Sequence, residues 1–216
     1  MVVPPLIQMR GIGVRMGRTP VLRQLDLSVA AGEVVGIRGS NGSGKTTLLR
    51  TIATLIKPSE GTGEVLGAGL DTEDRYLVRP RIGLIGHEAA LLEALTLWEN
   101  TAFVARFAGK TDDDAAAALE VVGLTRARHR AANDCSAGMR RRAEFARILL
   151  IEPTLLLFDE AHAGLDSEAT ALVEHVVKSV QAQDGAALVV SHQEDRTAPF
   201  TDRVLQLNDG RLWEAE

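Results

Sequence analysis

Several features that mark other classes of protein are scarce or missing in this chain. Cys135 is the only cysteine among 216 residues, so no disulfide can form within the chain, and a reducing compartment such as the cytoplasm fits this composition. Basic residues are not in excess, because the net charge is −5 and the pI is about 5.6. This balance argues against nucleic acid as the main partner.

Long apolar runs are missing as well. The longest stretch, near residues 148–158, is interrupted by Glu152 and Pro153, whereas a membrane-spanning helix needs about 20 apolar residues in succession. The first ten residues have neither the basic start nor the extended apolar segment of a signal peptide. The chain is therefore expected not to cross a bilayer by itself, and its length favours one domain over residues 1–216.

A glycine-rich segment over residues 39–46 carries the most specific pattern in the chain, G-x-x-x-x-G-K-[ST]. Its glycines allow backbone amides to turn inward around phosphate oxygens. Lys45 can reach the β- and γ-phosphates, and the Thr46 hydroxyl can bind Mg²⁺. The alternative is an ordinary turn between two buried elements, which the flanking strand and helix patterns disfavour. The nucleotide-binding residues are predicted to be Gly39, Ser40, Asn41, Gly42, Ser43, Gly44, Lys45, Thr46 and Thr47.

Strand and helix patterns surround this segment. Residues 33–38 form a β-branched run that predicts a strand, and residues 46–56 have apolar side chains at helical spacing and stop before Pro58. A closing hairpin is predicted over residues 203–213 around Asp209 and Gly210. Further strands are predicted over residues 6–14, 21–29, 61–67, 81–86, 155–159 and 186–191.

The middle of the chain is predicted to be helical. Thr96 and Glu99 form a capping box for a helix that reaches about residue 107, residues 111–114 cap a second helix, and a third covers residues 136–150. A further helix is predicted over residues 168–182. Strands alternating with helices on both sides of the middle predict an α/β fold with a parallel sheet. Residues 87–150 would form an inserted helical lobe, and residues 1–86 and 151–216 the remainder.

Two acidic residues, Asp159 and Glu160, follow the apolar strand 155–159. Ligands of parallel sheets bind at the carboxyl ends of the strands, so Asp159 is predicted to hold Mg²⁺ and Glu160 to orient and deprotonate the attacking water. An ordinary acidic strand-to-loop junction is the alternative. His192 ends the next buried strand, where it is either a structural histidine or a contact to the γ-phosphate.

The helix over residues 136–150 begins with a second candidate anion site. Ser136 is expected to be its N-cap, and with the amides of Ala137 and Gly138 it is also a candidate to face a phosphate. The arginines at positions 140–142 are expected to form a solvated helix face.

The order of these motifs resembles that of the nucleotide-binding subunit of ATP-binding cassette (ABC) proteins over nearly the whole chain. The matching segments are residues 39–46 for Walker A, 155–159 for Walker B, 163–166 for the D-loop, and 135–139 at the place of the signature, with His192 as the switch histidine. The resemblance implies a P-loop NTPase with a RecA-like parallel sheet core, a small antiparallel β lobe and an inserted α-helical lobe. It also implies that Glu160 and His192 are catalytic and that Asp166 lies at the nucleotide.

The resemblance further implies how such a protein would act. Two copies would form a head-to-tail homodimer that holds two ATP molecules with Mg²⁺, each between Walker A of one copy and Ser136 and Gly138 of the other. Separate transmembrane subunits are then the expected partners, with the chain on the cytoplasmic face of the inner or plasma membrane. The alternatives are the ATPase subunit of another ABC exporter, a soluble ABC ATPase that serves assembly or repair, and a nucleotide-binding regulator without turnover.

Three positions depart from the family pattern. The signature reads Cys-Ser-Ala-Gly-Met over residues 135–139, and Met16 stands where an aromatic side chain would stack on the adenine. Glu88 replaces the usual glutamine and is expected to bind Mg²⁺ through its carboxylate. The short length and the segments 86–88 and 136–142 look most like the haem exporter ATPase of cytochrome c maturation, which implies haem export.

Overall fold

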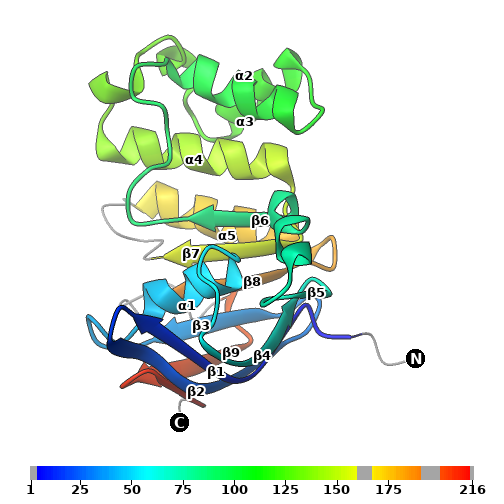
Figure 1. Ribbon diagram of the computed structural model, residues 1–216. Coiled ribbons are helices and arrows are strands. Elements are labelled where there is room, and N and C mark those ends of the chain that lie inside the picture. The colour runs from blue at the N-terminus through cyan, green and yellow to red at the C-terminus, as the bar shows by residue number, and fades with distance from the viewer. Residues whose placement is uncertain (1–3, 160–166, 191–199, 215–216) are drawn as a thin grey trace.

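Two β-sheets and a layer of helices make up the computed structural model of the chain, which describes residues 4–159, 167–190 and 200–214 (Figure 1). The larger sheet has the strand order β10-β9-β3-β8-β7-β6. The strands from β9 to β6 are parallel to their neighbours, and β10 pairs antiparallel with β9. The predicted α/β fold with a parallel core is confirmed. The strands are β3 (Val34–Arg38), β6 (Ile82–Ile85), β7 (Leu155–Asp159), β8 (Ala186–Val190), β9 (Arg203–Asn208) and β10 (Arg211–Glu214).

The second sheet is the predicted antiparallel β lobe, with the strand order β2-β1-β4-β5. Its long β1–β2 hairpin extends from the pair Ile7 and Val29 to the pair Met16 and Thr19, with shifts of register between Met9 and Arg15. The two residues of β5 are too few to give a sequence pattern, so this strand was not predicted. The strands are β1 (Ile7–Met16), β2 (Thr19–Val29), β4 (Glu60–Val65) and β5 (Ala68–Gly69).

Both faces of the larger sheet are covered, which explains why its strands are continuously apolar. Successive residues of a strand point to opposite faces. Phe158 and Val189 pack in one buried cluster with α4 (Ala137–Ile151) and α5 (Ser167–Gln181). Leu157 and Val190 pack in the other cluster with α1 (Lys45–Ile52) and the β lobe. The sheet therefore separates α1 from α4.

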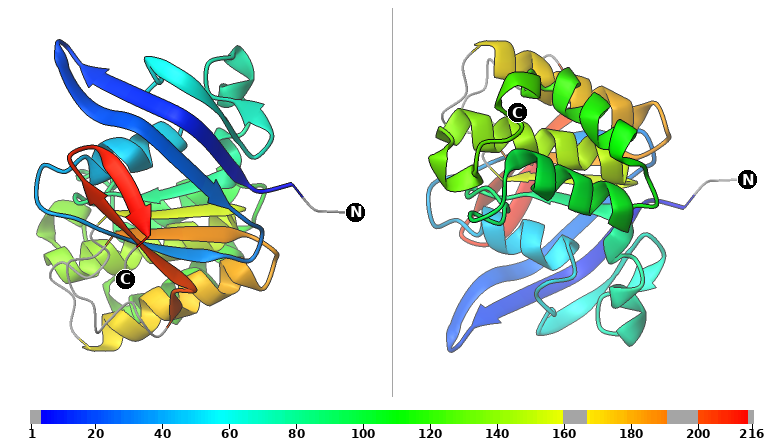
Figure 2. Two further views of the ribbon diagram at one scale, coloured as in Figure 1. Left: turned by 90° about the horizontal axis from the view of Figure 1, so that it is seen from below. Right: turned by 90° about the horizontal axis from the view of Figure 1, so that it is seen from above.

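The predicted helical lobe consists of α2 (Leu97–Phe107), α3 (Asp112–Val121) and α4, which lie together on one side of the larger sheet (Figure 2). Both predicted caps are present. The amide of Glu99 donates to Thr96 Oγ1 at 3.1 Å, and the amide of Asp114 donates to Thr111 Oγ1 at 3.2 Å. The carboxylates of Glu99 and Asp114 accept in return from the amides of Thr96 and Thr111. Short 3₁₀ turns lie at η1 (Glu73–Tyr76), η2 (Arg79–Arg81), η3 (Thr125–Ala127) and η4 (Ala132–Asp134).

Helix α1 is shorter than predicted, because it ends at Ile52 rather than at residue 56. Thr54 has a left-handed φ of 62°, and the amides of Leu55 and Ile56 both donate to the carbonyl of Arg50. The apolar spacing continues through this turn, so it did not reveal where the helix ends.

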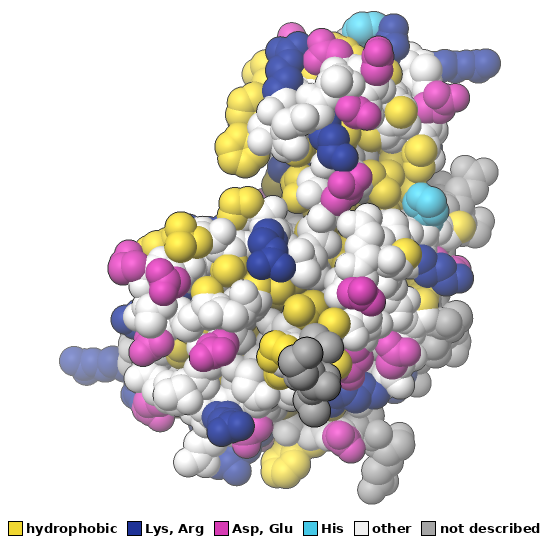
Figure 3. Space-filling model, turned by 90° about the vertical axis from the view of Figure 1, so that its right-hand side faces the viewer, with side chains coloured by type: hydrophobic (Ala, Val, Ile, Leu, Met, Phe, Trp, Pro, Cys, Tyr) yellow, Lys and Arg dark blue, Asp and Glu magenta, His cyan; other side chains and the backbone are white. Residues whose placement is uncertain are grey.

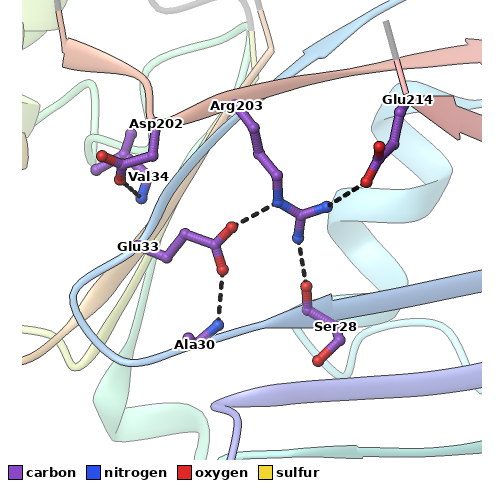
Figure 4. A network of polar contacts seen from close by, with 7 residues as sticks. All are labelled: Ser28, Ala30, Glu33, Val34, Asp202, Arg203 and Glu214. Carbon is purple, nitrogen blue, oxygen red and sulfur yellow. Dashed lines mark hydrogen bonds and ion pairs between the residues drawn. The ribbon is translucent and has the colours of Figure 1, made fainter.

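A polar network fixes the C-terminal hairpin to the start of β3 (Figure 4). Arg203 donates to the Glu33 carboxylate and to the Ser28 carbonyl, both at 2.5 Å. Asp202 accepts from the amide of Val34 at 2.7 Å. These contacts hold the strand that leads into the glycine-rich loop.

Candidate functional site

The parallel strands bring the glycine-rich loop and Asp159 to the same edge of the sheet. Ile37 in β3 and Asp159 in β7 both pair with Val190 of β8. Two strands separated by one neighbour are roughly 10 Å apart. Asp159 is only 7% exposed, so its carboxylate is held at the sheet edge beside the start of the loop.

The loop over residues 39–44 takes the conformation that its glycines permit. Gly42 and Gly44 have φ values of 80° and 108°, a region that strains other residues. A Cβ on Gly44 would lie 3.0 Å from the Leu22 side chain. Helix α1 begins directly afterwards, and Gly44 as its N-cap has no side chain to satisfy the first amides. The N-terminus of α1 therefore presents backbone N–H groups and the positive end of a helix dipole to an anion.

Two polar side chains point into this loop. Lys45 is 7% exposed, and its Nζ donates to the carbonyls of Gly39 and Ser40 at 2.8 and 2.9 Å. Within the described part of the chain, Ser43 Oγ is buried without a hydrogen-bond partner. A buried hydroxyl without a partner is unfavourable. A bound phosphate would supply the missing acceptor, so the residues present fit a triphosphate.

The three predicted Mg²⁺ ligands lie at this edge on different elements. Thr46 is exposed in the first turn of α1, and Glu88 is exposed three residues after β6. Because Ile85 of β6 pairs with Phe158 of β7, the chain after β6 leaves the sheet at the same edge as Asp159. No three His, Cys, Asp or Glu side chains gather as a metal site in the ranges that the structure covers. Mg²⁺ here would need phosphate oxygens to complete its shell, as it commonly does.

The second candidate anion site lies at the start of α4. Ser136 Oγ accepts from the amide of Met139 at 3.2 Å, so the predicted N-cap is confirmed. Ser136 and Ala137 are exposed and Gly138 is half-buried. Since α1 and α4 cover opposite faces of the sheet, the two predicted phosphate sites start from helices that the sheet separates.

The prediction of a solvated arginine face on α4 is wrong for Arg141. This side chain is buried, and its Nη1 donates to Glu144 Oε2 at 2.9 Å and to the carbonyl of Gly86 at 2.6 Å. Arg140 and Arg142 are half-buried. The physical reason is the carboxylate three residues further on, which lies on the same helix face and compensates the buried charge.

Glu144 is the residue at the site that the sequence analysis missed. It is 2% exposed, and its Oε1 accepts from the amide of Ala90 at 2.9 Å. Arg147 Nη1 donates to the carbonyl of the same Ala90 at 2.6 Å. An acid inside an otherwise apolar helix face was the signal that could have found it. We call Arg141, Glu144 and Arg147 the α4 clamp, because they hold both ends of the segment 86–90 that carries Glu88.

Burial shifts the pKa of two clamp residues. Desolvation raises the pKa of Glu144 above its ordinary value, against the opposing effects of the Ala90 amide and the Arg141 guanidinium. Desolvation likewise lowers the pKa of Arg147, against the effect of the Glu144 carboxylate. Both shifts have the sign expected for charges removed from water.

An apolar groove lies between the helical lobe and the start of β6. Phe103 and Phe107 of α2 are 62% and 79% exposed. Hydrophobic side chains gather on the helical lobe beside a hollow in the surface (Figure 3). The groove has a volume of about 550 Å³ and is lined by Arg79, Pro80, Ile82, Phe103, Val104, Phe107, Ala108, Arg147 and Ile151. The lining thus combines apolar side chains with two arginines, Arg79 and Arg147.

The structure does not place every predicted residue at this edge of the sheet. Glu160, Asp166 and His192 fall outside the described residues, so their roles stay predictions. Met16 lies at the turn of the β1–β2 hairpin and is 54% exposed. In the described ranges, no helix has the length and apolar character to span a membrane.

Comparisons with known proteins identify the family to which these motifs belong. The family model described as ABC transporter matches residues 22–163. The methionine import ATP-binding protein MetN of Cupriavidus necator is 37% identical over 221 residues, which cover 97% of this chain and 64% of the relative. MetN of Brucella abortus is 35% identical over 219 residues, covering 97% of this chain and 59% of the relative. The chain thus spans about 64% or less of the length of these relatives.

Two solved structures share the fold. A dimeric ATP-binding cassette in a post-hydrolysis state, bound to ADP and phosphate, has a TM-score of 0.84 and 26% identity, with 97% of this chain and 99% of that chain covered. A bacterial Atm1-family ABC exporter with ATP bound has a TM-score of 0.86 and 25% identity, with 99% of this chain and 39% of that chain covered.

Proposed function

Because the chain belongs to the ABC transporter family, we propose that it binds and hydrolyses ATP and that this reaction drives transport through a separate membrane subunit. The observation that carries the proposal is the loop over residues 39–44, with buried Lys45 and the unpartnered Ser43 hydroxyl, at the sheet edge that also holds Asp159. A triphosphate with its cation matches this combination of amides, ammonium and carboxylate.

Each residue of the site has a proposed role. Amides of the loop over residues 39–44 and of Thr46 and Thr47 bind the phosphate oxygens, and Lys45 exchanges its two carbonyl acceptors for the β- and γ-phosphates. Thr46, Asp159 and Glu88 would hold Mg²⁺, which would offset charge on the phosphates. Glu160 orients and deprotonates the attacking water, and His192 contacts the γ-phosphate. These last two roles, and that of Asp166 at the nucleotide, rest on the family resemblance.

A homodimer is part of the proposal. The glycine-rich loop over residues 39–44, the P-loop, precedes α1, whereas Ser136 and Gly138 begin α4 on the other face of the sheet. A second copy in head-to-tail orientation would place its Ser136 and Gly138 against the nucleotide of the first. A solved cassette of the same fold, bound to ADP and phosphate, is dimeric, which supports a dimer as such.

We propose that the membrane subunit docks in the groove beside Phe103 and Phe107. Exposed aromatic side chains are a common core of protein interfaces, and Arg79 and Arg147 at this groove favour an acidic partner. The chain would then be peripheral on the cytoplasmic face of the membrane, without nucleic acid as a partner.

The sequence resemblance and the comparisons with known proteins imply different cargoes. The segments 86–88 and 136–142 predict haem export, whereas the relatives described above are named for methionine import, which gives haem export no support. The proposal is therefore an ATP-driven transport subunit, and its cargo is tested by identifying what co-purifies with the membrane complex, by absorption for haem and by mass spectrometry for amino acids.

Phosphate release with Mg-ATP tests the proposed reaction. Lys45→Ala should weaken nucleotide binding at least about tenfold, the loss of one charge-assisted contact. Glu160→Gln should still bind ATP, accumulate as a dimer and hydrolyse about 10²-fold more slowly. The matched control is Glu64→Gln, an exposed acid on β4, which should match the wild type. Equal rates for Glu160→Gln and wild type would contradict the role given to Glu160.

A further inference from the structure

The α4 clamp connects two parts of the site that lie far apart in the sequence. We propose that Arg141 and Glu144, with Arg147, are positioning residues that lock the segment 86–90 to α4, so that Glu88 and the N-terminus of α4 move as one unit. This inference rests on the proposed function, because only then do Glu88 and Ser136 both face nucleotides.

The contacts of the clamp match the polarity of the backbone groups that they hold. Guanidinium donors of Arg141 and Arg147 meet the carbonyls of Gly86 and Ala90, and the Glu144 carboxylate meets the amide of Ala90. The three clamp residues are spaced by three along α4, so they lie on one side of the helix. Both ends of a five-residue segment are thereby fixed to a single helix.

A role in packing alone would not require these side chains. Apolar residues of similar volume could fill the space, and a buried ion pair is often no more stabilising than such a replacement. Apolar residues could not accept from the amide of Ala90 or donate to the two carbonyls. What the charged pair adds is therefore a defined position for the segment 86–90.

The segment and the first turn of α4 also share a cavity. Its lining includes Glu88 from the segment and Ala137 and Arg140 from α4. The cavity has a volume of about 420 Å³, so the clamp sets the distance across an open space rather than closing it. A displacement of Glu88 when Mg-nucleotide binds would accordingly displace the N-terminus of α4. A displacement of the N-terminus of α4 would likewise move Glu88.

The test compares three variants that differ in what they offer the backbone. Arg141→Met with Glu144→Leu removes the charges and the hydrogen bonds. Arg141→Glu with Glu144→Arg keeps an ion pair but presents a carboxylate to the Gly86 carbonyl and a guanidinium to the Ala90 amide. Glu144→Gln keeps an acceptor for the Ala90 amide and is the conservative variant.

Two readouts separate positioning from folding. Hydrogen exchange of the Ala90 amide should accelerate at least about tenfold in both double variants, because its acceptor is lost, and should stay slow in Glu144→Gln. The kcat for ATP hydrolysis should fall about tenfold in both double variants, the equivalent of one lost hydrogen bond, with a KM that changes by less than about twofold because the P-loop lies on the other face.

The outcomes are distinct. A folded Met/Leu variant that keeps its kcat would overturn the proposal, and so would full recovery of kcat in the charge-exchanged variant, because the pair would then act only through its charges. The proposal would also be overturned if Glu144→Gln lost as much kcat and as much protection of the Ala90 amide as the double variants. If the wild type hydrolyses no ATP, the proposed function itself fails, whereas exchange of Ala90 still reports on the clamp.

Discussion

Glu99 and Asp114 show how strongly one side chain can respond to the backbone next to it. Each carboxylate accepts from the amide of the N-cap residue of its helix, and this hydrogen bond is the largest cause that lowers its pKa, followed by the bond from the N-cap hydroxyl. Both carboxylates are exposed, so their value to the protein is local order at the first turns of α2 and α3.

The two caps should open in acid. The folded pKa lies below the ordinary values of 4.5 for Glu99 and 3.8 for Asp114, so the stabilisation is complete above those values and is lost as the pH falls through the lowered ones. Hydrogen exchange or NMR shifts of the Thr96 and Thr111 amides between neutral and strongly acid pH would detect this. Glu99→Gln should remove the titration at Thr96 and leave that at Thr111; a titration at Thr96 that survives would assign it to another group.

For single residues, the sequence predicted those features that depend on neighbours along the chain. The P-loop and the two capping boxes are local patterns of glycine, lysine, threonine and acid, and the structure places them as expected. The pairing of Glu144 with Ala90 spans 54 residues, and no local pattern announces a contact over that distance. The contact of Arg141 with the carbonyl of Gly86 spans 55 residues and was missed for the same reason.

At the scale of the element, α4 carries charge on a side that is buried. Its Arg141 and Glu144 side chains are 7% and 2% exposed, whereas the ion pair of Arg106 with Asp112 on the surface is 68% and 51% exposed. The first pair is shielded from water and the second is not, so their removal should have different consequences.

Removing one partner of the buried pair should be worse than removing both. Arg141→Met leaves Glu144 charged without its partner and should lower the free energy of unfolding by about 3–5 kcal/mol. The double variant with Glu144→Leu should lose only about 1–3 kcal/mol, chiefly for the unpaired Ala90 amide. Arg106→Met, the surface control, should cost at most about 1 kcal/mol. Urea unfolding measures all three, and additive losses in the double variant would show that the two charges do not interact.

Most helices and strands were predictable because their apolar residues recur with a clear period. The ends of these elements were harder to predict. The apolar runs of β7 and β8 and the caps of α2 and α3 gave bounds within one or two residues of those observed. The end of α1 was missed because it depends on the left-handed backbone of Thr54, a residue that shows no preference for that conformation. Roles for Glu160, Asp166 and His192 remain predictions from the motif order.

At the scale of the whole molecule, the groove beside Phe103 and Phe107 is a surface that the fold does not need. Side chains that are mostly exposed contribute little to the core. Their exposure is explained if another protein covers them, as the proposed membrane subunit would.

Substitution of both phenylalanines should separate stability from association. Phe103→Ser with Phe107→Ser should change the free energy of unfolding by less than about 1 kcal/mol and leave basal ATP hydrolysis intact. Recovery of the chain with membranes should fall at least about tenfold, as expected when central aromatic contacts are lost. Val121→Ser is the matched control, because Val121 is 54% exposed on α3 outside the groove. Undiminished membrane recovery of the double variant would place the docking surface elsewhere.

The larger sheet lies between α1 and α4, with one helix on each face. If each nucleotide is bound between the glycine-rich loop of one copy and the start of α4 of the other, then a single copy contains two half-sites and no complete site. The rate of ATP hydrolysis per copy would then fall as the protein is diluted. An inactive copy in a dimer would also lower the hydrolysis rate of the active copy bound to it.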